Sequence, residues 1–244
     1  RHRTDGTIDI RKRKTYDQQF LEIQHFFQEA KAYASLERRP ATSPRDLRME
    51  AMRGIFDGSF RLFVHAQDVR QITEAVHFKR QMGIENLVIV GGYDAPLVAD
   101  LLRENNVPVM LKRLHTLPRF AEDDVDMPYR LPKLLEDEGV LYCLQNAGDM
   151  EHMGTRNLPF YAGTARAYGL TYEQAVQSIT LNAARILGVD AFCGSLETGK
   201  DATLFISEGD ALDMRTNYLT EAFIQGRLID LDNRQRQLYR KYQT

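Results

Sequence analysis

The sequence predicts an α/β protein made of parallel β/α units and followed by a small β segment. From residue 60 onward, short apolar runs alternate with amphipathic helical stretches. Strands that are apolar throughout and lie between helices are typical of a parallel sheet with both faces covered. After residue 190, alternating apolar patches and turn residues replace the helical pattern, which indicates further strands outside the β/α units.

The composition is that of an ordinary globular protein. The chain has 244 residues, of which 43% are hydrophobic and 27% charged, and its formal net charge is −2. This charge argues against a nucleic-acid surface, and no apolar run reaches the roughly 18 residues of a membrane span. Cys143 and Cys193 lie far apart, without the spacing of a disulfide framework or a thiolate zinc site. We therefore expect a soluble protein, cytoplasmic or periplasmic, that contacts neither nucleic acid nor a membrane.

The helices and strands are predicted from hydrophobic spacing. Phe20, Ile23 and Phe27 recur at helical intervals and predict a helix over 17–36, which a Pro-rich linker over 37–46 follows. Four β/α units come next: strand 60–66 with helix 69–82, strand 85–92 with helix 95–106, strand 107–111 with helix 128–138, and strand 139–145 with helix 157–168.

The residues after these units predict one more helix, a β segment and a terminal helix. Thr171 and Gln174 fit a capping box, and Gly188 suits a left-handed helix stop. Two alternating stretches over 202–207 and 222–229 predict strands, with Gly226 at a turn. Residues 231–242 predict a terminal helix.

The run GSLETGKDATLF, from Gly194 to Phe205, carries a family resemblance. It follows TLNAARILGV (Thr180–Val189) and precedes FIQGRLIDL (Phe223–Leu231). This order resembles the end of enzymes of the amidohydrolase superfamily, especially imidazolonepropionase and its relatives. The resemblance implies a tail that returns from a catalytic (β/α)8 barrel to a small β-sandwich. It covers about Phe60–Asp230, and the first 60 residues match only loosely.

Only four β/α units are present, whereas a closed barrel has eight strands and about 250 residues. The resemblance therefore implies the second half of a (β/α)8 TIM-like barrel with a small C-terminal β-sandwich segment. The domains expected are a helical and linker segment (1–59), the barrel portion (60–190), the β-sandwich segment (191–230) and a C-terminal helix (231–244). An open half-barrel exposes a sheet edge, so we expect the N-terminal half of the barrel or a second subunit as a partner.

His65 ends the first predicted strand, in LFVHA. The resemblance implies that a His at this point binds a divalent metal, zinc or iron, and a neutral imidazole suits either. The alternative is a His that is hydrogen-bonded at a strand end. At the end of the next strand, where the resemblance implies a second His, Gly91 and Gly92 stand instead. Asp94 follows them and either caps the next helix or approaches a metal.

The fourth predicted strand leads to the position of the catalytic Asp that the resemblance implies, which is both ligand and general base. Asn146 or Ala147 stands there instead, and Asp149 is a candidate for a shifted substitute. Glu151 and His152 add two potential ligands close by, although a solvated loop explains all three polar residues equally. Because one matched ligand is too few for a catalytic zinc, we expect this chain to bind no metal tightly.

His115 follows the third predicted strand and is the candidate for substrate contact. The acidic loop AEDDVD over 121–126 could form a lid with it, or be solvated. The resemblance implies a hydrolase that acts on a non-peptide C–N bond of a small molecule, a cyclic amide or amidine, by metal-activated water, with a degenerate metal site here. The alternative is an inactive pseudo-amidohydrolase that serves as a binding or assembly module.

Overall fold

The computed structural model describes residues 11–36, 45–146 and 151–243, with side chains from 18 and from 153 in the first and last of these ranges. Contacts divide the chain into two compact units. The first unit contains Arg1–Leu62 and His77–Leu87, and the second contains Phe63–Val76 and Val88–Thr244. Among the described residues, no helix has the length and apolar character needed to cross a membrane.

The first unit is a helical layer with an aromatic core. Its elements are α1 (Arg11–Ala34), α2 (Leu47–Ala51), α3 (Arg53–Phe56) and the second half of α4 (Val69–Met82). The rings of Phe27 and Phe78 meet edge to face, with centroids 5.0 Å apart. Neither α2 nor α3 is evident from hydrophobic spacing, because each is a single turn. The Asp46 carboxylate starts α2 by accepting hydrogen bonds from the next turn of backbone.

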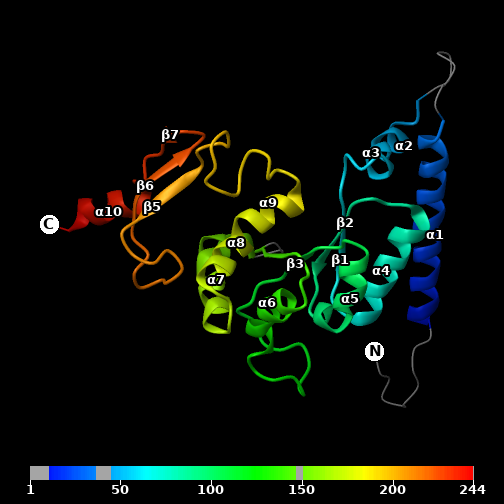
Figure 1. Cartoon of the computed structure of the whole chain (residues 1–244), viewed down its shortest axis with the longest axis horizontal. Coiled ribbons are helices and arrows are strands. Elements are labelled where there is room, and N and C mark those ends of the chain that lie inside the picture. The colour runs from blue at the N-terminus through cyan, green and yellow to red at the C-terminus, as the bar shows by residue number, and fades with distance from the viewer. Residues whose placement is uncertain (1–10, 37–44, 147–150, 244) are drawn as a thin grey trace. The chain divides into compact units, whose positions relative to one another are not determined.

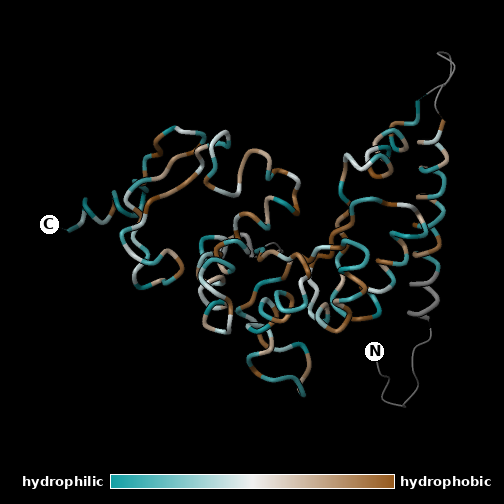
Figure 2. Tube along the Cα trace, in the orientation of Figure 1, coloured by the Kyte–Doolittle hydropathy of each residue, from teal (hydrophilic) through white to brown (hydrophobic). Residues whose placement is uncertain are grey.

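Apart from Leu62 and Leu87, the four-stranded sheet lies in the second unit, and its presence confirms the predicted α/β class. Its strands are β1 (Leu62–Ala66), β2 (Leu87–Gly91), β3 (Val109–Leu111) and β4 (Tyr142–Leu144), in the order β1-β2-β3-β4. Figure 1 labels the first three of them. The β2–β3 and β3–β4 pairs are parallel. Most residues of β2, β3 and β4 are buried, and Figure 2 shows the hydropathy along the Cα trace.

Helical segments connect and follow these strands. They are η1 (Ala95–Val98), α5 (Ala99–Glu104), α6 (Met127–Asp137), η2 (Glu151–Asn157), α7 (Leu158–Ala167), α8 (Tyr172–Ile179) and α9 (Leu181–Leu187). The predicted capping box is present, since the Thr171 and Gln174 side chains each bond the other residue's backbone N–H. Gly188 ends α9 at φ 73°. The single helix expected between these signals is two helices, because Thr180 leaves the helical region at φ −126° and ψ −91°.

The C-terminal part is a small antiparallel sheet followed by a helix. It consists of β5 (Leu204–Ser207), β6 (Leu219–Ile224), β7 (Arg227–Leu228) and α10 (Arg234–Tyr242). Gln225 and Gly226 join β6 to β7 at φ 50° and 75°, the two positive values of a type I′ hairpin turn. The turn predicted at Gly226 is therefore present. None of the residues in β5, β6 and β7, all of them described, is buried.

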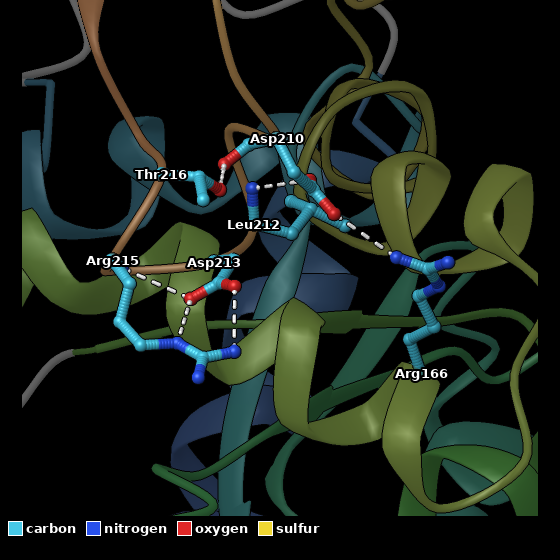
Figure 3. Close-up of polar contacts among 6 residues, drawn as sticks. All are labelled: Arg166, Asp210, Leu212, Asp213, Arg215 and Thr216. Carbon is cyan, nitrogen blue, oxygen red and sulfur yellow. Dashed lines mark hydrogen bonds and ion pairs between the residues drawn. The ribbon is translucent and has the colours of Figure 1, made fainter.

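The segment between β5 and β6 is fastened to α7. Asp210 accepts a hydrogen bond from the Arg166 guanidinium at 3.0 Å and from Leu212 N at 2.9 Å (Figure 3). Leu212 is 6% exposed. A Cβ atom on Gly163 would lie 2.2 Å from the Leu212 carbonyl oxygen. The absence of a side chain at Gly163 therefore lets this segment approach the helix.

Candidate functional site

His65 lies on one face of the sheet at its carboxyl-terminal end, where barrels of this class carry their active sites. Hydrogen bonds from Leu62 N to Asn86 O (2.9 Å) and from Gly92 N to Ala66 O (2.8 Å) fix the β1–β2 pairing. In a parallel ladder this pairing places His65 beside Val90.

The row that begins with His65 and Val90 continues across the sheet. Val90 is paired with Met110, and Met110 with Cys143. Cys143 is fully buried, and burial raises the pKa of its thiol to about 12. Because a metal binds the thiolate rather than the thiol, this row offers one effective ligand, His65.

The turn at Gly91 and Gly92 has no room for a side chain. Gly91 has φ 116°, and a Cβ atom there would lie 2.4 Å from Gln67 Nε2 and 2.9 Å from Ala66 O. Gly92 has φ 66°, and its Cβ would lie 2.5 Å from Val109 Cγ1. The Gln67 side chain is held in place, since its Oε1 accepts a hydrogen bond from Tyr93 N at 3.3 Å. A ligand side chain is therefore sterically excluded from this strand end.

Asn146 follows β4, at the position where a catalytic Asp is implied. Both polar atoms of its side chain, Oδ1 and Nδ2, are buried and have no hydrogen-bond partner among the described residues. A neutral amide can donate and accept hydrogen bonds but cannot take up a proton as a general base. Asp149 and Ala147, and the side chains of Glu151 and His152, lie outside the described residues.

Asp94 does not cap the helix that follows it. No side-chain hydrogen bond to η1 is formed; instead its carboxylate accepts a hydrogen bond from Val69 N at 3.2 Å, at the start of α4. Asp68 accepts a hydrogen bond from Gln71 N at 2.9 Å and pairs with Arg119 at 3.4 Å. The carboxylates of both loops are therefore engaged in structural contacts, because orphan N–H groups at a helix start need acceptors.

The loop after β3 is fastened to the end of β2 by Tyr93. The Tyr93 hydroxyl donates to the Asp123 carboxylate at 2.6 Å and accepts from Arg119 N at 3.2 Å. The Tyr93 and Phe120 rings meet edge to face at 6.4 Å. Burial and the Asp123 carboxylate raise the pKa of Tyr93. Part of the acidic loop is thus bound to the strand ends rather than solvated throughout.

We expect Tyr93→Phe to loosen the loop after β3 without unfolding the sheet. The change removes both hydrogen bonds of the hydroxyl and keeps the ring contact, so the loss of stability should be about 1 kcal/mol. Hydrogen exchange should become faster over residues 116–126. The exposed Tyr239 of α10 gives the matched control, Tyr239→Phe, which should change neither quantity. Unaltered exchange in Tyr93→Phe would contradict this role of the hydroxyl.

His115 faces α7 and not the row of His65. Its Nε2 lies 2.7 Å from Thr164 Oγ1, and this hydroxyl also lies 3.0 Å from Phe160 O. The Phe160 carbonyl can only accept, so the single proton of the Thr164 hydroxyl is donated to it. The hydroxyl oxygen therefore accepts from His115, and Nε2 is the donor. Burial and the nearby Arg113 charge lower the pKa of His115. The imidazole is therefore neutral near pH 7, with Nδ1 available as an acceptor.

A cavity of about 470 Å³ opens beside His115. Residues of α7 and of the β5–β6 segment complete its wall, among them Arg166, Asp210 and Met214. The cavity combines a neutral imidazole with an ion-paired guanidinium and apolar side chains, the mixture that small-molecule sites use. His115 therefore remains a candidate for ligand contact. The residues that line the cavity with it lie far away in the sequence, so spacing does not predict them.

The described residues do not fit a divalent metal ion. They contain no group of three or more His, Cys, Asp or Glu side chains placed to hold one, and a catalytic zinc normally has three protein ligands. Sequence reasoning also missed Gln67 and Tyr93, which organise the strand ends. Their position directly after strands was the available signal, but both have side chains that are common in ordinary loops.

Comparisons with known proteins agree with this architecture. The amidohydrolase family profile matches residues 64–229. A crystal structure of an amidohydrolase from Thermotoga maritima is 27% identical, with a TM-score of 0.73, and the match covers 85% of this chain and 54% of that chain. No curated protein matches the sequence.

Two more distant structures share the fold. A prolidase complexed with N-methylphosphonate-L-proline is 16% identical, with a TM-score of 0.54, over 78% of this chain and 51% of that chain. Phenylurea hydrolase B is 15% identical, with a TM-score of 0.54, over 85% of this chain and 56% of that chain. The chain thus spans about half the length of the structures that it matches. It belongs to the amidohydrolase family, and its parallel sheet is part of that family's barrel.

Proposed function

We propose that this chain forms part of a hydrolase that acts on a non-peptide C–N bond of a small molecule, a cyclic amide or amidine. The observation that carries the proposal is the family match over residues 64–229, because this range contains the carboxyl ends of all four strands. In a barrel those ends face the substrate. The 27% identity to the amidohydrolase from Thermotoga maritima supports the reaction class and leaves the substrate to experiment.

Hydrolysis of a C–N bond needs a polarised carbonyl or amidine carbon, an attacking water and a proton for the leaving nitrogen. Asn146 Nδ2 has no hydrogen-bond partner among the described residues, but it is buried and does not line the cavity beside His115. His115 Nδ1 can accept a hydrogen bond from a substrate N–H. We therefore assign substrate contact to His115, and Asn146 stays a candidate through its position after β4.

The family implies a divalent metal that would activate the water, but the described residues do not fit one. His65 is its one matched position, and we give it no catalytic step. Asp149 remains our candidate for the proton-accepting carboxylate, by analogy with the Asp of the family. Any further ligands would have to come from outside the described residues, from the N-terminal half of a barrel or from a second subunit.

A second candidate function is an inactive binding or assembly module with the same fold. The steric exclusion of a side chain at Gly91 favours this function. A metal-ligating residue could return to this position only if the loop were rearranged, which indicates that the strand end no longer serves a metal. In this reading the ligand cavity beside His115 persists and hydrolysis does not occur.

A substrate panel separates the two functions. The purified protein would be assayed with cyclic amides, cyclic ureides, amidines and Xaa-Pro dipeptides, with and without added zinc. We expect turnover in the cyclic class, lost in Asp149→Asn and reduced mainly through a higher KM in His115→Ala. The exposed His77 of α4 gives the control, His77→Ala, which should match the parent. Binding without turnover for every substrate would favour the inactive module.

A further inference from the structure

We infer that the described residues at the carboxyl ends of the sheet exclude a divalent metal ion, and that a single substitution at Gly91 cannot restore a site there. The inference concerns the sheet alone and does not depend on the substrate. Its starting point is steric. A ligand side chain on Gly91 would have to pass through Gln67 Nε2, 2.4 Å from its Cβ, and the backbone oxygen of Ala66 at 2.9 Å.

The backbone adds to this steric exclusion. Gly91 has φ 116°, a conformation that residues with a Cβ rarely adopt. The Gln67 side chain is tied to the end of β2, because its Oε1 accepts a hydrogen bond from Tyr93 N at 3.3 Å. Turning the side chain away would break this hydrogen bond, although the backbone bonds from Gly92 N to Ala66 O and from Asp94 N to Gln67 O would remain. The exclusion of a side chain at Gly91 therefore depends on the loop after β1 as well as on the loop after β2.

The row of residues beyond His65 is also unsuited to a cation. Bonds from Gly92 N to Ala66 O, from Lys112 N to Gly91 O and from Gln145 N to Leu111 O extend the ladder by one residue. These bonds place four residues side by side in a second row: Gln67, Gly92, Lys112 and Gln145. Each lies two positions after a residue of the His65 row on the same strand, so the side chains of both rows point to the same face of the sheet. This outer row contains an ammonium group and two amides, and no carboxylate.

The carboxylates nearest to these strand ends are already engaged. Asp68 bonds Gln71 N and Arg119, Asp94 bonds Val69 N, and Asp123 bonds the Tyr93 hydroxyl and Phe120 N at 3.2 Å. Recruiting any of them to a metal would leave a helix start or the loop after β3 without its acceptor. A cation at this face would thus meet one imidazole and one ammonium, with no free anionic ligand among the described residues.

Zinc and cobalt binding test the inference directly. The parent protein, dialysed against zinc, should retain no stoichiometric metal, and Co²⁺ should give no tetrahedral absorption bands. Zinc affinity in His65→Ala should equal that in the control His77→Ala. Stoichiometric metal that disappears in His65→Ala, or in Asp149→Asn, would overturn the inference whether or not the protein is an active hydrolase.

A pair of variants tests the steric reason. Gly91→His should lower the melting temperature by several degrees, through overpacking and backbone strain, and should gain no zinc affinity over the parent. Gln67→Gly combined with Gly91→His removes the Gln67 side chain but leaves the Ala66 carbonyl oxygen and the positive φ of residue 91. This double variant should still bind zinc no more tightly than the parent. A Gly91→His protein that melts normally and binds zinc more tightly would show that the position is open.

Discussion

Gly163→Ala should destabilise the protein by about 2 kcal/mol, although the same change in an ordinary helix stabilises it by about 1 kcal/mol. Gly163 lies in the middle of α7, where alanine is the better helix former. A Cβ atom there would lie 2.2 Å from the Leu212 carbonyl oxygen, much closer than a carbon and an oxygen can approach. The segment between β5 and β6 must move away, and Leu212 then loses its buried position.

The sign of the effect makes this a sharp test. Urea unfolding gives the change in free energy, and hydrogen exchange over residues 210–217 shows whether the segment has detached. Leu212→Ala is the matched control, since it removes the same buried side chain without a clash and should accelerate exchange in the same residues.

Arg166→Gln separates packing from charge. It removes the ion pair to Asp210 and the contact of the guanidinium with the Tyr172 ring. Because the Arg166 side chain is 49% exposed, the effect should stay within about 1 kcal/mol. If Gly163→Ala stabilised the protein and left exchange unchanged, the close approach of this segment to α7 would be wrong.

The strands and most helices could be predicted because their signals are local. The apolar runs that predict β2 and β4 need both faces covered, and Val69–Met82 is helical over the range that its spacing indicates. Short helices such as α2 depend on one capping residue, Asp46, and lack enough turns for a periodic pattern. The break at Thr180 lies within a continuous helical pattern and depends on packing between α8, α9 and β4.

The candidate site was less predictable because its geometry depends on distant residues. Two glycines after a strand indicate a turn, but the exclusion of a side chain comes from Gln67 on the preceding loop. His115 can be proposed from its place after a strand, whereas its tautomer is set by Thr164, 49 residues later. Asp94 shows the same limit, since its partner Val69 N lies 25 residues earlier.

The β1 edge of the sheet should be paired with a further strand in the working protein. β1 is at one end of the strand order, and Phe63 is 41% exposed. The Leu62 amide bonds toward β2, and amides alternate along a strand, so those of Phe63 and His65 point away from β2. An apolar edge with free donors and acceptors is a template for strand pairing.

Light scattering and hydrogen exchange test this pairing together. We expect concentration-dependent association of the chain, with slow exchange at Phe63 and His65 comparable to that of Val64, whose amide points toward β2. Phe63→Lys should abolish the association, because a charged side chain on an edge strand opposes pairing. Leu238→Lys, on the exposed face of α10, is the control and should associate as the parent does. A monomer at every concentration, with rapid exchange at Phe63 and His65 and slow exchange at Val64, would show that the edge is open to water.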